Sequence, residues 1–457
     1  MSFQSIDWLA FLPGPCQKII GRIHASNYGK RISVGAFWSF SGSAIQRLLL
    51  LVSSIFCAQI LGKNAYGELG MIRSTINMFV VLGAMGLGMT AAKYISEYRD
   101  KRKDRAAVIY LLTNLFGGST GLIATSAVIL LAPAIADMMN APELIGGIRW
   151  GGVLLLFSII NGIQTGTLSG FEDFKAIAIN SVWAGISEFI CILIGAYYWG
   201  VIGAILGYGI GFLVLTVTNS LAIKQNLKKN AIIPDIHQLK AEDFNVIWKF
   251  SIPAMLSSLM VIPVFWYVKT LLVQQDGFGA LAIFDAADQW KMIILFIPGA
   301  VARIVLPILS NIHGGGEHRT YIKVLLLNIA INAAITLFMT LLVIIGGKYI
   351  MLLYGKGFNE TTPLVLLAVS TLFTSIATVV GAAIASRAKM WIGLGFNLFW
   401  GIMTVAFSYY FLRQGYGASG LAGAILLSYI IHASLQATYL FCALRQLPKN
   451  RFYNLYV

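Results

Sequence analysis

The chain has 457 residues, of which 58% are hydrophobic and only 11% charged, and its mean hydropathy is +0.78. Soluble domains carry roughly 25% charged residues, so this composition excludes a water-facing surface over most of the molecule. The net charge of +15 lies mostly in short loops between apolar runs, which the positive-inside rule explains better than nucleic-acid binding does. Each run is long enough to cross ~30 Å of hydrocarbon, and we predict an all-α integral membrane protein.

The apolar runs predict about twelve transmembrane helices. In the first half of the chain they are residues 33–61, 67–94, 107–132, 144–169, 176–199 and 201–223. In the second half they are residues 250–273, 281–309, 324–347, 363–385, 391–412 and 417–444. The longest predicted loop separates the halves, which predicts an N-terminal segment (1–32), a six-helix lobe (33–225), a linker (226–248), a second six-helix lobe (249–444) and a tail (445–457).

The loops predict the orientation, because Lys and Arg accumulate on the cytoplasmic side. Loops after even-numbered helices, together with both ends of the chain, carry 22 of these residues, and the other side carries 4. Both termini are therefore predicted to be cytoplasmic. A short repeated pattern, called the sequence echo below, also links the halves. It consists of a glycine, a leucine two residues later and an ionisable residue six positions after the glycine. The pattern occurs at Gly67, Leu69 and Arg73, and again at Gly279, Leu281 and Asp285. Parallel six-helix repeats of this kind are found in transporters.

Catalytic and metal-binding patterns are missing from the sequence. The predicted loops on the outer side are short, and none holds paired carboxylates, a Ser/His/Asp set or a metal-ligand cluster, so we predict no enzyme, no metal and no cofactor. The four cysteines are far apart and predict no disulfide framework. Of five histidines only His432 lies inside a predicted helix, where a hydrogen-bonded structural role and a proton-relay role are both open.

Charges inside the apolar runs are the most informative residues. An unpaired charge at mid-bilayer costs roughly 2.5 kcal/mol or more, so such residues usually face a bundle interior or a wet cavity. The alternative is a long side chain reaching the headgroups from a helix end, which suits Lys93, Arg149 and Arg303 but not Arg47 or Lys291, which lie near mid-span. The candidate substrate-binding residues are Arg47, Arg73, Arg149, Lys269, Lys291 and Arg303.

The acidic residues inside the runs are fewer, namely Glu68, Glu188, Asp285 and Asp288. Asp288 and Lys291 are three residues apart on one helical face, so a structural ion pair is one interpretation. Ion coupling by Asp285, Asp288 or Glu68 is the other. The excess of basic residues predicts a positive central cavity suited to a phosphate or pyrophosphate, which arginine binds in a bidentate manner.

Helix breakers cluster in the same runs. They are Gly83, Gly86 and Gly88 in the second helix, Pro253 and Pro263 in the seventh, and Pro298 and Pro307 in the eighth. Interrupted helices at matching places in two halves indicate a binding site, although membrane helices also tolerate such residues without function.

Six segments carry a resemblance to a known family. They are 61–67 (LGKNAYG), 86–93 (GLGMTAAK), 166–175 (GTLSGFEDFK), 250–258 (FSIPAMLSS), 283–290 (IFDAADQW) with 307–310 (PILS), and 353–358 (LYGKGF). Together they resemble the polysaccharide transporter family, the Wzx-type O-antigen and exopolysaccharide repeat-unit flippases of the multidrug/oligosaccharidyl-lipid/polysaccharide (MOP) exporter superfamily.

The resemblance implies a MATE/MOP-like fold of two six-helix lobes and transport by alternating access. The implied cargo is an oligosaccharide on undecaprenyl pyrophosphate, flipped to the outer leaflet of the bacterial inner membrane. H⁺ or Na⁺ as counter-ion, and the polymerase and chain-length proteins of the same pathway as partners, are implied as well.

Two other functions stay open. An ion-coupled multidrug or cation antiporter of the related family would be expected to have a cavity richer in acids. A membrane glycan polymerase would be expected to have a large outer loop with catalytic acids.

Overall fold

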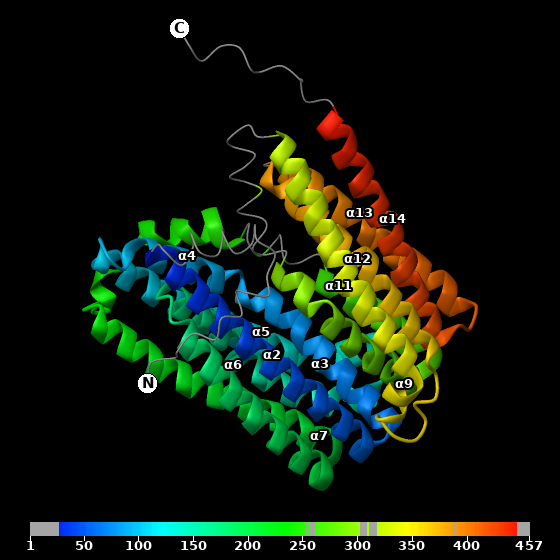
Figure 1. Ribbon diagram of the computed structural model, residues 1–457. Helices are drawn as coiled ribbons and strands as arrows, with labels where there is room; N and C mark the ends of the chain where they lie inside the picture. Colours follow the sequence, from blue (N-terminus) through cyan, green and yellow to red (C-terminus); the bar gives the residue numbers. More distant parts are fainter. Residues whose placement is uncertain are drawn as a thin grey trace, which may run out of the picture.

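Long helices build the protein, as the apolar runs predict. The computed structural model describes residues 27–252, 255, 261–301, 309, 318–387 and 389–445, and every regular element in these ranges is a helix (Figure 1). The long helices are α2 (Asn27–Leu61), α3 (Lys63–Ala84), α4 (Leu87–Tyr98), α5 (Lys103–Met138), α6 (Ile145–Gly170), α7 (Phe174–Lys229), α9 (Val261–Ile294), α11 (His318–Leu352), α12 (Thr362–Ser386), α13 (Met390–Arg413) and α14 (Gly417–Arg445). Short helical turns are η2 (Pro142–Leu144), η3 (Ile236–Gln238), η4 (Ala241–Phe244) and the π-helix η5 (Ile247–Ser251).

Within the described ranges, eight helices are long and apolar enough to cross a membrane, or nine if the bent pair α3 and α4 counts as one span. The all-α membrane fold is therefore confirmed, whereas the total of twelve spans stays a prediction. The division into lobes at 226–248 also stays a prediction.

Two long helices contain a chain reversal. The 56 residues of α7 would measure roughly 84 Å as a straight helix, far more than the ~30 Å of hydrocarbon. Gly200 interrupts α7 with φ 59° and ψ −138°, and Gly195 then packs directly against Gly203. The break falls between the predicted helices 176–199 and 201–223. Gly277 interrupts α9 in the same way.

The first turn of each half has the same backbone conformation. Gly62, between α2 and α3, has φ 77° and ψ 172°, and Gly277 has φ 76° and ψ −179°. Residues with a side chain almost never adopt this region, so glycine is required at both turns. The shared conformation supports a repeat, but it aligns Gly62 with Gly277 and not Gly67 with Gly279, so the register of the sequence echo is wrong.

Two of the predicted breakers interrupt helices. The pair α3 and α4 is bent by 43° at Met85 and Gly86, both of which have positive φ. Helix α9 ends at Ile294 and a turn follows at Leu295, because Pro298 has no N–H to bond the Ile294 carbonyl. Pro253 and Pro307 lie outside the described residues.

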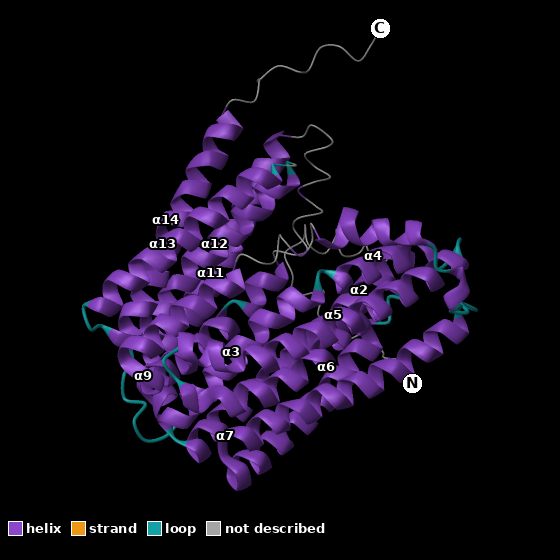
Figure 2. Ribbon diagram, turned by 180° about the vertical axis from the view of Figure 1, so that it is seen from behind, coloured by secondary structure: helices purple, strands orange, loops and turns teal. Residues whose placement is uncertain are grey.

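The helices form two groups, an N-terminal group (α2–α7) and a C-terminal group (α9 and α11–α14) (Figures 1 and 2). The groups meet where α3 packs against α9, and they spread apart toward α4 on one side and the C-terminal end of α14 on the other. The largest buried core crosses this contact and includes Leu69 and Ile72 of α3 and Phe284 of α9.

The predicted linker packs on the N-terminal group. Arg105 of α5 forms an ion pair of 2.7 Å with Asp243 in η4. Farther along, the hydroxyl groups of Thr90 and Ser251 are 2.6 Å apart, and the ammonium of Lys93 lies 4.2 Å from the centre of the Phe250 ring. The chain that leads into α9 is therefore attached to α4 before it reaches the C-terminal group.

Aromatic side chains mark the opposite end of the helices. Tyr197, Tyr198 and Trp199, next to the turn at Gly200, are strongly exposed, as expected for a belt at a membrane–water interface. We call the surface with the turns at Gly62, Gly200, Gly277 and Gly415 the turn face. The asymmetry of basic residues predicts that it faces away from the cytoplasm.

Candidate substrate-binding site

The candidate site lies where α3 meets α9. A Cβ atom at Gly67 would overlap the backbone carbonyl of Phe278, and one at Gly70 would overlap the carboxylate of Asp285. The two helices therefore approach this closely only because α3 presents glycine there. Most of the sequence-predicted charges of the described ranges lie on these two helices or contact them.

Lys269 and Asp285 form an ion pair across the reversal in α9. The ammonium lies 2.8 Å from the carboxylate, and only 14% and 11% of the two side chains are exposed. Each residue stands eight positions from Gly277, so the pair closes the hairpin. Because Asp285 also contacts Gly70, this carboxylate belongs to the contact between the two groups.

Lys291 and Asp288 form a second ion pair, on one face of α9. Their charged atoms are 2.8 Å apart, which is the pairing expected from the three-residue spacing. The side chain of Lys291 is buried, and its ammonium also lies 4.7 Å from the centre of the Phe265 ring. Both lysines of the candidate site are thus neutralised in this conformation.

Arg73 on α3 has an aromatic partner. Its guanidinium lies 4.4 Å from the centre of the Tyr208 ring in the second half of α7, a cation–π contact. Glu188, which is buried in the first half of α7, interacts with Arg73 electrostatically. The planar fork of Arg73 is therefore held inside the N-terminal group beside a compensating carboxylate.

Arg47 on α2 reaches from one group of helices to the other. Its Nη1 donates a hydrogen bond of 3.2 Å to the carbonyl of Met292, and its guanidinium lies 5.0 Å from the centre of the Phe296 ring. Arg47, which lies near the middle of its predicted span, thus connects α2 with the end of α9.

The other predicted residues have different surroundings. Arg149 is exposed near the start of α6, as expected for a side chain that reaches the headgroups. Arg303 lies outside the described residues. Glu68 is partly buried and lines a pocket on the turn face instead of the contact with Asp285.

A neutral hydrogen-bond network lies at the same contact and was not predicted from the sequence. The amide of Gln289 on α9 donates to the hydroxyl of Tyr66 at 2.7 Å and to that of Ser54, and these two hydroxyls also bond to each other. Trp266 likewise donates to Thr75 at 3.0 Å. Neutral polar residues inside the apolar runs of both halves are the sequence signal for this network.

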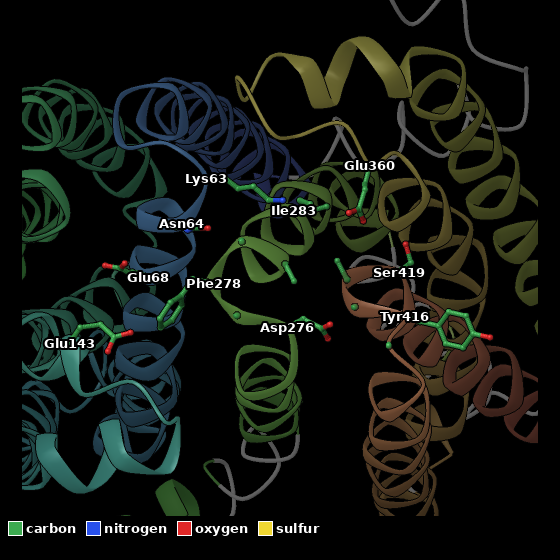
Figure 3. A pocket seen from close by; sticks show the side chains of 16 residues that line it. Lys63, Asn64, Glu68, Glu143, Asp276, Phe278, Ile283, Glu360, Tyr416 and Ser419 are labelled. Atoms are coloured by element: carbon green, nitrogen blue, oxygen red, sulfur yellow. The ribbon is translucent and has the colours of Figure 1, made fainter.

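A pocket of about 890 Å³ opens among the turns of the turn face (Figure 3). Its lining includes four carboxylates, from Glu68, Glu143, Asp276 and Glu360, and one ammonium, from Lys63. Burial, together with the nearby charge of Glu360, raises the pKa of Asp276. These acids come from separate turns, so no single stretch of sequence predicts the pocket.

The charge around the α3–α9 contact is less positive than expected from the sequence. Among the described residues, Arg47, Arg73, Lys269 and Lys291 supply four positive charges, and Glu188, Asp285 and Asp288 supply three negative ones. The net excess of these seven residues is therefore one positive charge. Substrate binding by these residues stays a prediction.

A family model for polysaccharide biosynthesis proteins matches residues 32–313, more than half of the chain. The chain belongs to this polysaccharide biosynthesis protein family. The EPS I polysaccharide export inner membrane protein EpsE of Ralstonia solanacearum is 23% identical over 402 residues, which cover 85% of this chain and 89% of that protein. The protein of the same name from Ralstonia nicotianae is 27% identical over 193 residues, which are 41% of this chain and only 44% of that protein.

Solved structures show the same fold. An inward-facing multidrug-resistance MATE transporter of the MOP superfamily superposes with a TM-score of 0.79 at 18% identity, covering 90% of this chain and 99% of that chain. An outward-facing MATE transporter gives 0.66 at 19% identity, covering 92% and 97%. A MOP transporter from Pyrococcus furiosus, described as having a binding pocket of reverse polarity, gives 0.67 at 18% identity, covering 92% and 97%. The MATE/MOP-like fold is confirmed.

Proposed function

We propose that the protein is a flippase for lipid-linked oligosaccharides. In this proposal it moves repeat units carried on undecaprenyl pyrophosphate from the cytoplasmic to the outer leaflet of the bacterial inner membrane. Three observations support it: the polysaccharide biosynthesis family, the relatives named polysaccharide export inner membrane proteins, and the MOP transporter fold.

The observation that carries the proposal is the set of buried and partly buried basic residues at and beside the contact of α3 and α9. A pyrophosphate with its sugars cannot cross hydrocarbon unaided, whereas the polyprenyl tail need never leave it. Arg73 and Arg47 would supply the bidentate, charge-assisted hydrogen bonds that phosphate oxygens favour. Lys269 and Lys291 would supply further positive charge once the cargo displaces the carboxylates of Asp285 and Asp288.

The same contact supports a mechanism of alternating access. The α3–α9 packing holds the groups together near the turn face while they spread apart toward α4, so cargo would enter from the predicted cytoplasmic side. Release requires this packing to separate. Moving two uncompensated negative charges outward would gain roughly 4.6 kcal/mol per 100 mV of inside-negative potential.

A second candidate function is the export of organic cations by ion-coupled antiport. The buried carboxylates of Glu188, Asp285 and Asp288 favour it, because a cationic drug needs interior negative charge. The experiment below therefore includes a cationic substrate.

A vesicle assay tests the proposal. Purified protein is reconstituted into liposomes with a fluorescent undecaprenyl-pyrophosphate oligosaccharide, and transfer to the outer leaflet is measured by quenching. We expect Arg73→Gln to lower the rate about tenfold or more, since a hydrogen bond to a charged group contributes about 1.5–3 kcal/mol. Arg413→Gln, the same change at an exposed arginine outside the candidate set, should transfer cargo normally. A wild-type protein that moves an ethidium-like cation but no lipid-linked glycan would refute the flippase and support the antiporter.

A further inference from the structure

Among the described residues, twelve buried side-chain atoms have no hydrogen-bond partner, and four of them lie on the packed helices α13 and α14. These atoms are Trp400 Nε1 and Ser408 Oγ on α13, and His432 Nδ1 and Gln436 Oε1 on α14. At most 6% of any of these residues is exposed. A membrane interior offers little water to satisfy such atoms, and buried polar groups without partners are uncommon in folded proteins. The four on this pair of helices can therefore accept or donate a further hydrogen bond, to a ligand or to a bound proton.

Three of the four lie together. His432 and Gln436 are one helical turn apart and share a face of α14. The ring of Tyr429 links them to α13, because it lies 5.2 Å from the ring of Trp400 and 6.3 Å from that of His432. His432 also hydrogen-bonds to the backbone of Phe396. Since Nδ1 has no partner, this bond uses Nε2, which leaves a lone pair on Nδ1.

A series of rings connects this cluster with the candidate substrate-binding site. The ring of Trp400 lies 5.9 Å from that of Phe265. The ammonium of Lys291, which is paired with Asp288, lies 4.7 Å from the centre of the same Phe265 ring. A change of charge at His432 would therefore occur within the same packed unit that holds Lys291.

We propose that His432 is a proton-binding site, and that its protonation strengthens anion binding at Lys291. The Nδ1 lone pair accepts a proton from water, and the new N–H donates to Gln436 Oε1. Histidine is the side chain that changes charge in the physiological pH range. A metal cation fits the cluster less well, because the N–H of Trp400 is a donor only and repels a cation.

The surrounding titratable groups do not cancel this charge. On its own helix His432 faces Tyr429, and Tyr439 lies across the ring of Phe396. From α9 come Asp288 and Lys291, which neutralise each other. Around the ring in the described part of α13 are Phe396 and Trp400, and α12 contributes the hydroxyl of Thr374 through Tyr429. Protonation therefore adds one net positive charge to this unit.

Histidine-labelled NMR of the wild-type protein in lipid nanodiscs tests the first half of the proposal without any cargo. The resonance that disappears in His432→Gln is assigned to His432. We expect it to shift between pH 4.5 and 8.5. A resonance that stays constant over this range would overturn the proton site. His237→Gln, the same change at an exposed histidine of η3, supplies the assignment control.

Binding of undecaprenyl diphosphate tests the link to Lys291, which rests on the proposed function. Affinity is measured at pH 6 and pH 8, and variants are compared because the probe itself also titrates. In wild type and His237→Gln we expect the gain at pH 6 to exceed that in His432→Gln by about fivefold, the lower end of typical coupling between sites. An equal gain in His432→Gln would overturn the link. Absence of binding in every protein would overturn the proposed cargo, while the NMR titration still decides on His432.

Discussion

The ammonium of Lys269 lies 2.8 Å from the carboxylate of Asp285, although the two residues stand on opposite arms of the α9 hairpin. The same carboxylate touches Gly70 on α3. One ion pair thus stabilises the hairpin and takes part in the contact between the two helix groups. Structural and cargo-binding roles of Lys269 can therefore be separated only by changing both partners.

Neutralising both partners of this pair should preserve the fold and abolish transport. Removing one member of a buried pair costs about 3–5 kcal/mol, so Lys269→Met alone should lower the unfolding temperature in detergent clearly. The double variant Lys269→Met with Asp285→Asn leaves no unpaired charge and should recover most of the loss. Its vesicle flipping should nevertheless stay low, because cargo has lost a cation. Wild-type flipping by the double variant would assign Lys269 a structural role alone.

A methyl group at Gly67 should disturb the contact that closes the turn face. The Cβ of Gly67→Ala would overlap the Phe278 carbonyl, which is backbone and cannot turn aside. We expect a larger separation between spin labels at exposed Asp137 and Tyr416, measured by pulsed EPR in a background without the native cysteines. Gly118→Ala, whose Cβ meets no atom within 4 Å, is the matched control. Identical distance distributions in the two variants would show that this contact does not hold the groups together.

Truncation of Arg47 or Lys291 should remove surface glycan from cells. Arg47→Ala loses the bond to the Met292 carbonyl, and Lys291→Ala removes the ion-pair partner of Asp288. Each should reduce export about tenfold or more, since such charged hydrogen bonds contribute about 1.5–3 kcal/mol. Glycan is quantified by antibody staining, and membrane abundance by immunoblot. The exposed residues Arg413 and Lys348 provide matched alanine controls. Normal glycan in both test variants would exclude an essential cationic site.

The turn-face pocket should make stability depend on pH. Burial and the charge of Glu360 raise the pKa of Asp276 above its ordinary value of 3.8. The folded protein therefore binds this proton more tightly than the unfolded chain, and the contribution of Asp276 to stability falls as pH rises through the raised pKa. Asp276→Asn should accordingly unfold at a higher temperature than wild type at pH 7, and at about the same temperature near pH 4. Asp104 is an exposed aspartate at the start of α5, away from the turn face. Asp104→Asn should show no such pattern.

Much of the fold follows from the sequence, because hydrocarbon permits few backbone solutions. A run of apolar residues predicts a span, and the interruption near Gly200 was placed correctly by composition alone. The paired turn glycines were misaligned, since the echo matched residue types whereas the structure matches backbone conformation at Gly62 and Gly277.

The candidate site was predictable only where its contacts are local. The Asp288–Lys291 pair follows from spacing on one helix. The stacking of Arg73 on Tyr208 and the pairing of Lys269 with Asp285 depend on how distant segments return, which spacing does not encode. The four carboxylates of the turn-face pocket meet for the same reason, each supplied by a different turn.

Gly277 has a consequence for interpreting natural variation in this family. Gly277 has no side chain and takes part in no ion pair. A residue of any other type would nevertheless distort the hairpin that brings Lys269 to Asp285. A bacterial isolate that lacks surface polysaccharide can therefore owe this phenotype to replacement of one glycine, although every charged residue of the transporter is unchanged.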